Sequence, residues 1–506
     1  MPASRAPVVG AEHRVLPDQP IESLAQYEAI DGGAGLFGAM AVEREVVLAE
    51  LEASGLRGRG GAGFPTGAKW RTILSFASDV LPTTVVVNAA EGEPGTFKDR
   101  LLLERNPYAV LEGAMIAAHV ANAHTITIAT KHTFPQVARL REVIAEVSHA
   151  SWNPGFEFVV VEGPREYLYG EETALLEVID GRPPFPRIAP PWRRGLVDVV
   201  DDVDQIDDVV AGSALSANVE LATDSDDNVV PPVLVNNVET FANVAMIIAK
   251  GASWFRSVGT AKTPGTLLCT ITGAVARPGV YEVPAGTPLG EVLAMAQPPA
   301  DETMAATPGP PGFVLLGVSN AILTPDQFDT PISHEAFAAL GTGLGSASFI
   351  AVDSAADPVA VAAGVSRFLA VESCGQCTPC KQDGLEISTI LDELCSGTAE
   401  EDALERLDQR LSTVADGARC NLAAQQQTVV GSIRRAFPAA FPARLEPDVE
   451  PVERALVAEL VTLEGTRAEV DTTFEQKQPD WTHDETDSGQ SPVDRLSDHR
   501  ADESNP

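Results

Sequence analysis

The chain is poor in cysteine and in basic residues, and each shortage argues against a class of protein. Six cysteines in 506 residues are too few for the disulfide framework of a small secreted domain. Lys and Arg number 35 against 72 Asp and Glu, and the formal net charge of −37 disfavours general binding to nucleic acid or to an anionic membrane. The first residues have no apolar signal-peptide core, and no run of ~18 clean apolar residues predicts a membrane span. We therefore expect a cytoplasmic protein.

Apolar residues make up 44% of the chain, which is enough for several buried cores. Residues 84–89, 125–129 and 156–163 have the composition of buried strands, and residues 41–54 and 108–122 have helical periodicity. This alternation predicts an α/β layer. From residue 264 the pattern of strand, turn, strand and helix predicts a small α+β module. From about residue 355 the pattern becomes helical.

Five of the six cysteines lie between Cys374 and Cys420, and their spacing is the strongest chemical signal in the sequence. Cys374, Cys377 and Cys380 are each separated by two residues, and Cys420 follows forty residues later. A cysteine run that is completed by a remote cysteine is typical of a 4Fe–4S cluster. Four thiolates also bind zinc, although structural zinc sites usually show two separated pairs. Buried core thiols are the third interpretation, and we prefer it for Cys269 and Cys395.

A glycine-rich loop, Gly58-Arg59-Gly60-Gly61-Ala62-Gly63, follows the first predicted helix. It matches G-x-G-x-x-G, but it is preceded by a helix-like segment and not by a strand, so it is not a standard Rossmann fingerprint. Its glycines still permit close approach to a phosphate group. The window between Glu52 and Asp79 contains four basic residues and no acid, which favours an anionic ligand. A plain glycine turn with solvated arginines is the simpler alternative.

Three further segments place polar side chains where strands end or helices begin. Asn88 and the residues through Gly95 follow a predicted strand, a common position for ligand contacts in open α/β sheets. The segments Tyr167–Thr173 and Val235–Thr240 carry carboxylates and amides at the start of predicted helices. Helix capping accounts equally well for both of these segments.

Five ordered motifs together resemble a known family. GLRGRGGAGFPTGAKW, NAAEGEPGTFKDR, YGEETALLEVIDGR, VNNVET and ESCGQCTPC are similar to motifs of the NADH-oxidising flavoprotein subunit of respiratory complex I. The same module occurs in diaphorase subunits of NAD-linked hydrogenases and formate dehydrogenases. The resemblance covers roughly residues 45–445. It implies a multidomain α/β fold with a Rossmann-like FMN-binding domain, a small ubiquitin-like β-grasp (SLBB) domain and a C-terminal helical bundle that carries a 4Fe–4S cluster.

The resemblance also implies roles for individual residues. Glu93 and Glu172 are expected to orient NADH during hydride transfer to FMN, and Phe64 and Trp192 to offer stacking faces to the nucleotide. Cys374, Cys377, Cys380 and Cys420 are expected to bind the cluster. The remaining expected cofactor-binding residues are Gly58, Arg59, Gly60, Gly61, Gly63, Lys69, Asn88, Glu91, Tyr167, Gly170, Glu171, Asn236 and Asn237.

Several positions depart from the family pattern. Ala90 replaces an aspartate, Tyr169 replaces a cysteine, and Ala189 stands where a lysine is expected to meet a nucleotide phosphate. The acidic stretch 197–232 lengthens a connection that is short in the family. Loss of a cation and gain of negative charge both disfavour a pyrophosphate. We therefore expect a weakened NADH site beside well-preserved FMN and cluster motifs.

The sequence thus predicts an NADH:acceptor oxidoreductase subunit that passes electrons from FMN to a 4Fe–4S cluster. The resemblance implies a thioredoxin-like 2Fe–2S subunit and a larger Fe–S subunit as partners, and through them a peripheral position on the inner face of a membrane. One alternative is a diverged subunit of a formate dehydrogenase or hydrogenase with another electron donor. Another is a non-redox scaffold with structural zinc.

Five segments describe the expected domain organisation. They are an N-terminal extension (1–44), an FMN- and NADH-binding α/β domain (45–255) with the acidic insertion, a β-grasp domain (256–350), a cluster-binding helical bundle (351–445) and an acidic, disordered tail (446–506).

Overall fold

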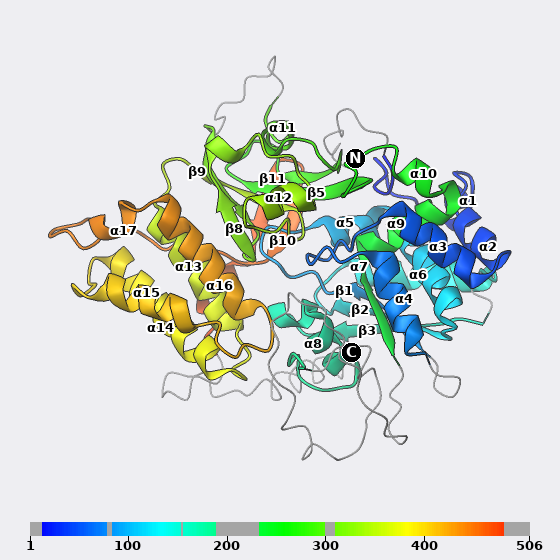
Figure 1. Ribbon diagram of the computed structural model, residues 1–506, viewed down its shortest axis with the longest axis horizontal. Helices are drawn as coiled ribbons and strands as arrows, with labels where there is room; N and C mark the ends of the chain where they lie inside the picture. Colours follow the sequence, from blue (N-terminus) through cyan, green and yellow to red (C-terminus); the bar gives the residue numbers. More distant parts are fainter. Residues whose placement is uncertain (1–12, 78–82, 153–154, 189–231, 299–308, 480–506) are drawn as a thin grey trace.

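The structure is a computed structural model that describes residues 13–77, 83–152, 155–188, 232–298 and 309–479. Figure 1 shows an α/β part and a helical bundle at opposite ends of the long axis, with a second sheet between them. Trp192, Ala189, the insertion 197–232 and residues 480–506 lie outside the described residues, apart from Pro232 at the end of the insertion.

The α/β part is built on a four-stranded parallel sheet of order β3-β2-β1-β4. Strands β1, β2 and β4 are mostly buried and rich in β-branched residues, as expected for a parallel sheet covered by helices, whereas the edge strand β3 is mostly half-buried or exposed. The strands are β1 (Thr84–Ala89), β2 (Thr125–Lys131), β3 (Glu157–Gly163) and β4 (Val233–Asn237). The main helices around them are α3 (Arg44–Ser54), α4 (Thr66–Ser75), α5 (Lys98–Arg105), α6 (Pro107–Ala121), α7 (Gln136–His149), α8 (Glu172–Ile179) and α9 (Val238–Lys250).

Residues 13–44, for which the sequence suggests an extension, are part of the α/β core. This segment contains the short helices α1 (Leu24–Glu28) and α2 (Ala34–Met40). Its residues Val15, Leu16 and Leu36 belong to the same buried cluster as the strand residues of the α/β part. A buried carboxylate on α6 holds this segment. Glu112 accepts hydrogen bonds from the Tyr27 hydroxyl (2.6 Å) and from the Gly33 amide (2.8 Å).

The second unit is a five-stranded mixed sheet of order β6-β5-β9-β7-β8. Antiparallel hairpins flank a parallel central pair, β5 and β9, and a helix connects the two halves, as in the expected β-grasp fold. The elements are β5 (Thr266–Gly273), β6 (Gly279–Pro284), α11 (Leu289–Met295), β7 (Pro311–Leu316), β8 (Asn320–Leu323), α12 (His334–Ala339) and β9 (Ser348–Asp353). Cys269 is fully buried in β5, which confirms its role as a core residue. The short helix α10 (Ala252–Phe255) precedes this sheet.

The third unit is a helical bundle with its own apolar core. Cys395 lies inside this core, as the sequence predicted. Its helices are α13 (Pro358–Glu372), α14 (Thr378–Ser396), α15 (Ala403–Thr413), α16 (Leu422–Ala436) and α17 (Ala440–Ala443). Within the described ranges, no helix is long and apolar enough to cross a membrane.

The prediction of a disordered tail from residue 446 onward is wrong for residues 446–479. These residues form a hairpin of β10 (Leu460–Glu464) and β11 (Arg467–Val470), followed by the 3-10 turn η4 (Thr472–Gln476). Leu460 and Leu463 are buried in the core of the α/β part. The acidic composition concealed a small number of well-placed apolar residues, and these are sufficient to dock the segment.

The Glu112 network generates a stability prediction. Glu112→Ala leaves the Tyr27 hydroxyl and the Gly33 amide without their acceptor in a buried site, which should destabilise α1 and α2 by about 3 kcal/mol. Hydrogen exchange of residues 24–40 measures this loss. The control Glu142→Ala removes a carboxylate that is 67% exposed and should change protection by less than about 0.5 kcal/mol. Equal protection of residues 24–40 in the two variants would contradict the assignment.

Candidate functional site

Polar residues gather where two adjacent strands, β1 and β4, end. The register of the pair places Val87 opposite Asn236 and Asn88 opposite Asn237. Because both strands are parallel, these amides lie at the same carboxyl edge of the sheet, where open α/β folds bind ligands. The sequence pattern indicates only the start of a helix here and misses strand β4, so it does not predict that Asn88 and Asn237 are neighbours.

The glycine-rich loop lies between α3 and α4 and is enclosed by neighbours on two sides. Gly61 and Gly63 have positive φ angles (120° and 63°), which non-glycine residues rarely adopt. A Cβ atom on Gly60 would lie 3.3 Å from the Asn237 Cβ, and one on Gly63 would lie 2.3 Å from the His334 ring. Burial and the nearby Arg59 charge lower the pKa of His334 to about 4. The loop is therefore shaped by the sheet edge and by the β-grasp unit together.

The Arg59 side chain, which was expected among the cofactor contacts, is bonded within the protein. Its side chain is 4% exposed and points into the β-grasp interface, where it donates to the carbonyl oxygen of Thr266 (3.0 Å). Its backbone amide donates to the Thr240 hydroxyl. Arg59 thus anchors the loop to the elements behind it.

Lys69 and Glu172, which were expected to meet the phosphate and the nucleotide, form an ion pair with each other. The pair joins the first turn of α4 to the first residue of α8. Phe64, at the end of the glycine loop, is 48% exposed. These three residues remain available to a bound nucleotide.

Asn88 connects the end of β1 to the turn before α8. Its side-chain amide donates to the Gly170 carbonyl oxygen (2.9 Å), and its side-chain oxygen accepts from the Ala90 amide (3.2 Å). The adjacent Glu171 is the N-cap of α8, with its carboxylate bonded to the amides of Thr173 and Ala174. The capping interpretation of Glu171 is therefore correct.

Three other expected cofactor contacts have their side chains committed to the protein itself. Glu91 binds the Arg100 guanidinium (2.8 Å) and the Asp99 amide at the start of α5. Asn236 accepts from the Trp70 indole, and Asn237 caps α9 while it donates to Asp99. Their side chains position the loop and strand ends around the site.

Glu93, which was expected to orient NADH, also joins the α/β part to the β-grasp unit. One carboxylate oxygen accepts from the Ser319 hydroxyl (2.6 Å) and the other from the Ser346 hydroxyl (2.5 Å). Burial raises the pKa of Glu93, while these hydroxyl donors oppose the rise. Glu93 therefore holds the two units together, and its role toward NADH stays a prediction.

Two departures from the family pattern fall in one buried cluster. Ala90 is 1% exposed, and Tyr169 is fully buried; both pack with Val86, Ala129 and Leu175. Burial raises the pKa of Tyr169. A smaller side chain at 90 and a larger one at 169 thus fill the same core, so these changes affect the packing beneath the site.

The four predicted cluster cysteines line one cavity, together with Leu168, Pro186 and Arg419. Cys374, Cys377 and Cys380 come from the turn before α14 and its first residues, and Cys420 precedes α16. Burial raises the pKa of Cys380 to about 11 and raises that of Cys420 as well.

Polar groups surround these sulfur atoms. The Arg419 amide donates to Cys377 Sγ and the Gln376 side chain donates to Cys374 Sγ, both at 3.4 Å. Such donors stabilise thiolates in iron–sulfur sites. Across the described ranges, no three His, Cys, Asp or Glu side chains converge on a point that would suit a single metal ion. Four thiols that line one cavity are the donor set of a 4Fe–4S cluster, in which each iron takes one thiolate.

A single 3-10 turn, η1 (Tyr167–Gly170), contacts both the sheet edge at Asn88 and the cysteine cavity. Gly170 accepts the Asn88 hydrogen bond at the sheet edge, and Leu168 lines the cysteine cavity. Tyr167 lies between them; its ring meets Phe368 edge-on, and its hydroxyl donates to Gln425 of the bundle. Burial, followed by the charge of Glu93, raises the pKa of Tyr167.

The fold and the two adjacent sites define a flavin-binding, iron–sulfur electron-transfer protein. Residues 51–246 match the family described as the Nuo51 FMN-binding domain, and residues 360–444 match the NADH-ubiquinone oxidoreductase-F iron–sulfur binding region. Residues 268–296 match the SLBB domain. The glycine loop, Lys69 and Asn88 fit an FMN group, and the four cysteines fit a 4Fe–4S cluster.

Relatives of known identity extend this result over most of the chain. The chain is 32% identical over 437 residues to the second NADH-quinone oxidoreductase F-subunit of Rhizobium meliloti, covering 84% of this chain and 94% of that one. It is 32% identical over 404 residues to the corresponding F-subunit of Escherichia coli, covering 76% and 81%. The chain belongs to the F-subunit family of NADH-quinone oxidoreductases. Its cofactors are FMN and a 4Fe–4S cluster, and its substrate is NADH.

A solved structure with a similar fold is the NAD+-reducing NiFe hydrogenase in its H2-reduced state. The TM-score is 0.69 at 29% sequence identity, and the match covers 84% of this chain and 67% of that one. The names of these relatives describe one part of a larger oxidoreductase, so the family works within multisubunit complexes.

The shape of the glycine loop generates a prediction about flavin binding. Gly63→Ala places a Cβ atom against His334 and strains a left-handed residue, which should lower the affinity for FMN by roughly tenfold or more. Flavin released from the purified protein on dilution measures this change.

A double variant and a matched control make the test specific. Gly63→Ala combined with His334→Ala should recover part of the bound flavin, because the clash is relieved. Gly155→Ala should retain full flavin content, since Gly155 also has positive φ but has open space around it. The shape argument fails if Gly63→Ala binds FMN as tightly as the unmodified chain.

Proposed function

We propose that this chain takes hydride from NADH onto FMN and delivers electrons singly to the cluster held by Cys374, Cys377, Cys380 and Cys420. A flavin accepts two electrons together and can release them one at a time. The observation that carries the proposal is the turn Tyr167–Gly170, which contacts the strand end at Asn88 and the cysteine cavity. The protein contributes orientation, a dry path and cofactor binding.

Individual residues then have distinct tasks. Phe64 offers an exposed aromatic face on which a nicotinamide ring can stack. Lys69 supplies a cation for the FMN phosphate, and Glu172, its partner in the ion pair, lies where it can meet polar groups of the nucleotide. Asn88 fixes the turn through Gly170, and Trp192 is proposed as a second stacking face on the basis of the sequence alone.

We further propose that electrons leave the cluster for other Fe–S proteins. The chain has one cysteine set suited to a cluster, so a thioredoxin-like 2Fe–2S subunit and a larger Fe–S subunit are the proposed acceptors. The similarity to the NAD+-reducing hydrogenase supports a second arrangement, in which electrons are exchanged with a hydrogenase partner. In either arrangement the protein acts in the cytoplasm.

Anaerobic titration tests the substrate. NADH should bleach the flavin absorbance of the loaded protein and then the broad cluster absorbance, as dithionite does. If dithionite bleaches the flavin but millimolar NADH does not, the NADH assignment is wrong, and a different electron donor is required. A protein that contains stoichiometric zinc and no flavin would instead support the scaffold alternative.

Residue 189 tests the predicted weakness of the nucleotide site. Ala189→Lys restores the cation expected to meet a nucleotide phosphate and should lower the KM for NADH by roughly tenfold with little change in kcat. Ala189→Gln is the matched control, because it adds length without charge. An unchanged KM in Ala189→Lys would show that this position does not contact the nucleotide.

A further inference from the structure

The segment 446–479, here called the C-terminal strap, leaves the bundle and returns to it after crossing the α/β part. Its first residues run along α13 and α14: the Val452 amide donates to the Cys395 carbonyl oxygen (2.9 Å), and the Ala455 amide to that of Ala360 (3.1 Å). Gly364 on α13 has no room for a side chain, because a Cβ atom there would lie 2.2 Å from the Ala455 oxygen. The bundle is thus shaped to receive the strap.

The strap next docks on the α/β part. Glu459 forms an ion pair with Lys131 at the end of β2 (2.7 Å). Leu460 is buried in the α/β core, and its carbonyl oxygen accepts from Arg100, the residue that also binds Glu91. Asp471 then pairs with Arg165, just before the turn Tyr167–Gly170.

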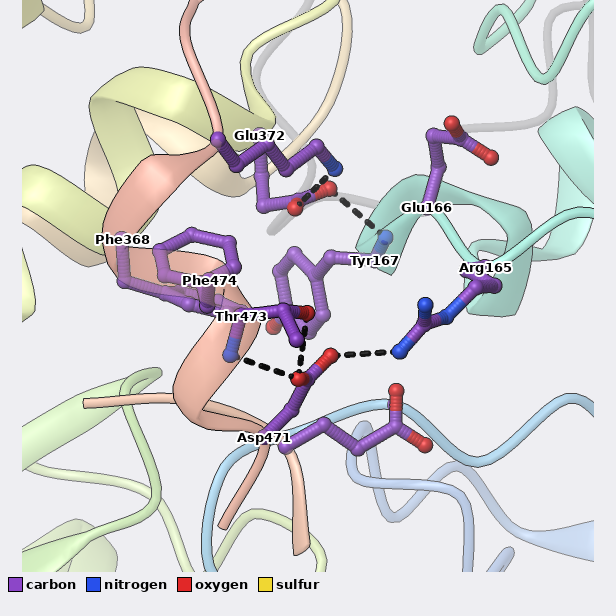
Figure 2. Close-up of a pocket in the computed structure, with 11 residues that line it drawn as sticks. Arg165, Glu166, Tyr167, Phe368, Glu372, Asp471, Thr473 and Phe474 are labelled. Atoms are coloured by element: carbon purple, nitrogen blue, oxygen red, sulfur yellow. Dashed lines mark hydrogen bonds and ion pairs between the residues drawn. The ribbon is translucent and has the colours of Figure 1, made fainter. Parts of the chain in front are cut away.

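The last part of the strap returns to the end of α13. A cavity of about 260 Å³ lies between the α/β part, the bundle and the strap. Figure 2 shows the rings of Phe474 and Phe368 on one side of it. These ring centroids are 5.1 Å apart. Lys477 follows and binds Glu372 at 2.5 Å.

Glu372 is the point where the strap meets both redox sites. One of its carboxylate oxygens accepts from Lys477, and the other accepts from the Tyr167 amide (2.9 Å), as Figure 2 shows. Glu372 is the last residue of α13 and lies two residues before Cys374. Its carboxylate therefore joins the first residue of the flavin-side turn to the loop that begins the cysteine set.

We propose that Lys477 is a positioning residue for electron transfer between flavin and cluster, acting through Glu372. The Glu372 side chain is only 4% exposed, and Lys477 is its cation. A buried carboxylate that loses its cation is strongly disfavoured. Without Lys477, the Glu372 side chain rotates toward the cavity and releases the Tyr167 amide. The turn Tyr167–Gly170 then loses its fixed position relative to the cysteine loop. This inference rests on the proposed function.

Lys477→Met tests the inference in the full chain, because methionine keeps most of the aliphatic stem. Amide exchange in residues 165–170 should become faster by roughly tenfold, the effect of losing one charge-assisted hydrogen bond. In stopped-flow experiments with NADH, the rate of flavin reduction and the KM should stay unchanged, while reduction of the cluster slows. Lys477→Arg should restore both readouts.

Two further variants separate positioning from general loosening. Lys262→Met removes an exposed lysine in another part of the chain and should change neither readout. Glu372→Gln combined with Lys477→Met should slow cluster reduction no more than the larger single effect, because both changes act on one contact. Unchanged exchange in residues 165–170, or additive effects in the double variant, would overturn the inference.

Failure of the proposed function is distinguishable from failure of this inference. If NADH does not reduce the flavin of the unmodified protein, the amide-exchange comparison still decides whether Lys477 holds the turn. Slower flavin reduction in Lys477→Met, in parallel with slower cluster reduction, would also contradict a role confined to the step between the two sites.

Discussion

The contact on which the rest of the structure depends is made by one short turn, Tyr167–Gly170, held between two units of the chain. Gly170 is bonded to Asn88 at the edge of the parallel sheet, and Leu168 lies against the cysteine cavity. Electron transfer between two cofactors requires a fixed short separation, and we propose that this turn sets it. The surrounding contacts serve to keep the turn in place.

Much of the polar chemistry near the site is structural in this sense. Glu91, Glu93, Arg59 and Asn237 all carry side chains that a ligand could use, yet each is committed to a neighbouring element. A flavoprotein of this kind needs no general base, because the flavin supplies the redox chemistry when bound. The protein contributes rigid placement, and buried polar side chains bonded to neighbouring elements provide it.

The sequence alone predicts features that depend on local residue spacing, but it does not predict contacts between segments that are distant in the chain. The cysteine set, a small α+β unit after residue 264 and strands β1 to β3 could be predicted from local patterns, and the family resemblance identified that unit as a β-grasp domain. Strand β4 was missed because it is short and runs directly into α9. The contacts of Glu93 depend on partners more than 200 residues away in the sequence. Those of Glu372 depend on its ion pair with Lys477. The strap was predicted to be disordered because its overall composition is acidic, and two apolar residues, Leu460 and Leu463, are enough to bury it in the α/β core.

A structure of the protein loaded with FMN and its iron–sulfur cluster tests the central claim most directly. The account predicts that the isoalloxazine ring lies beside Asn88 and Gly170, that the four cysteines hold one cluster, and that the turn Tyr167–Gly170 fills the space between the two groups. A flavin bound away from the carboxyl ends of β1 and β4, or a cluster separated from this turn by another part of the chain, would contradict it.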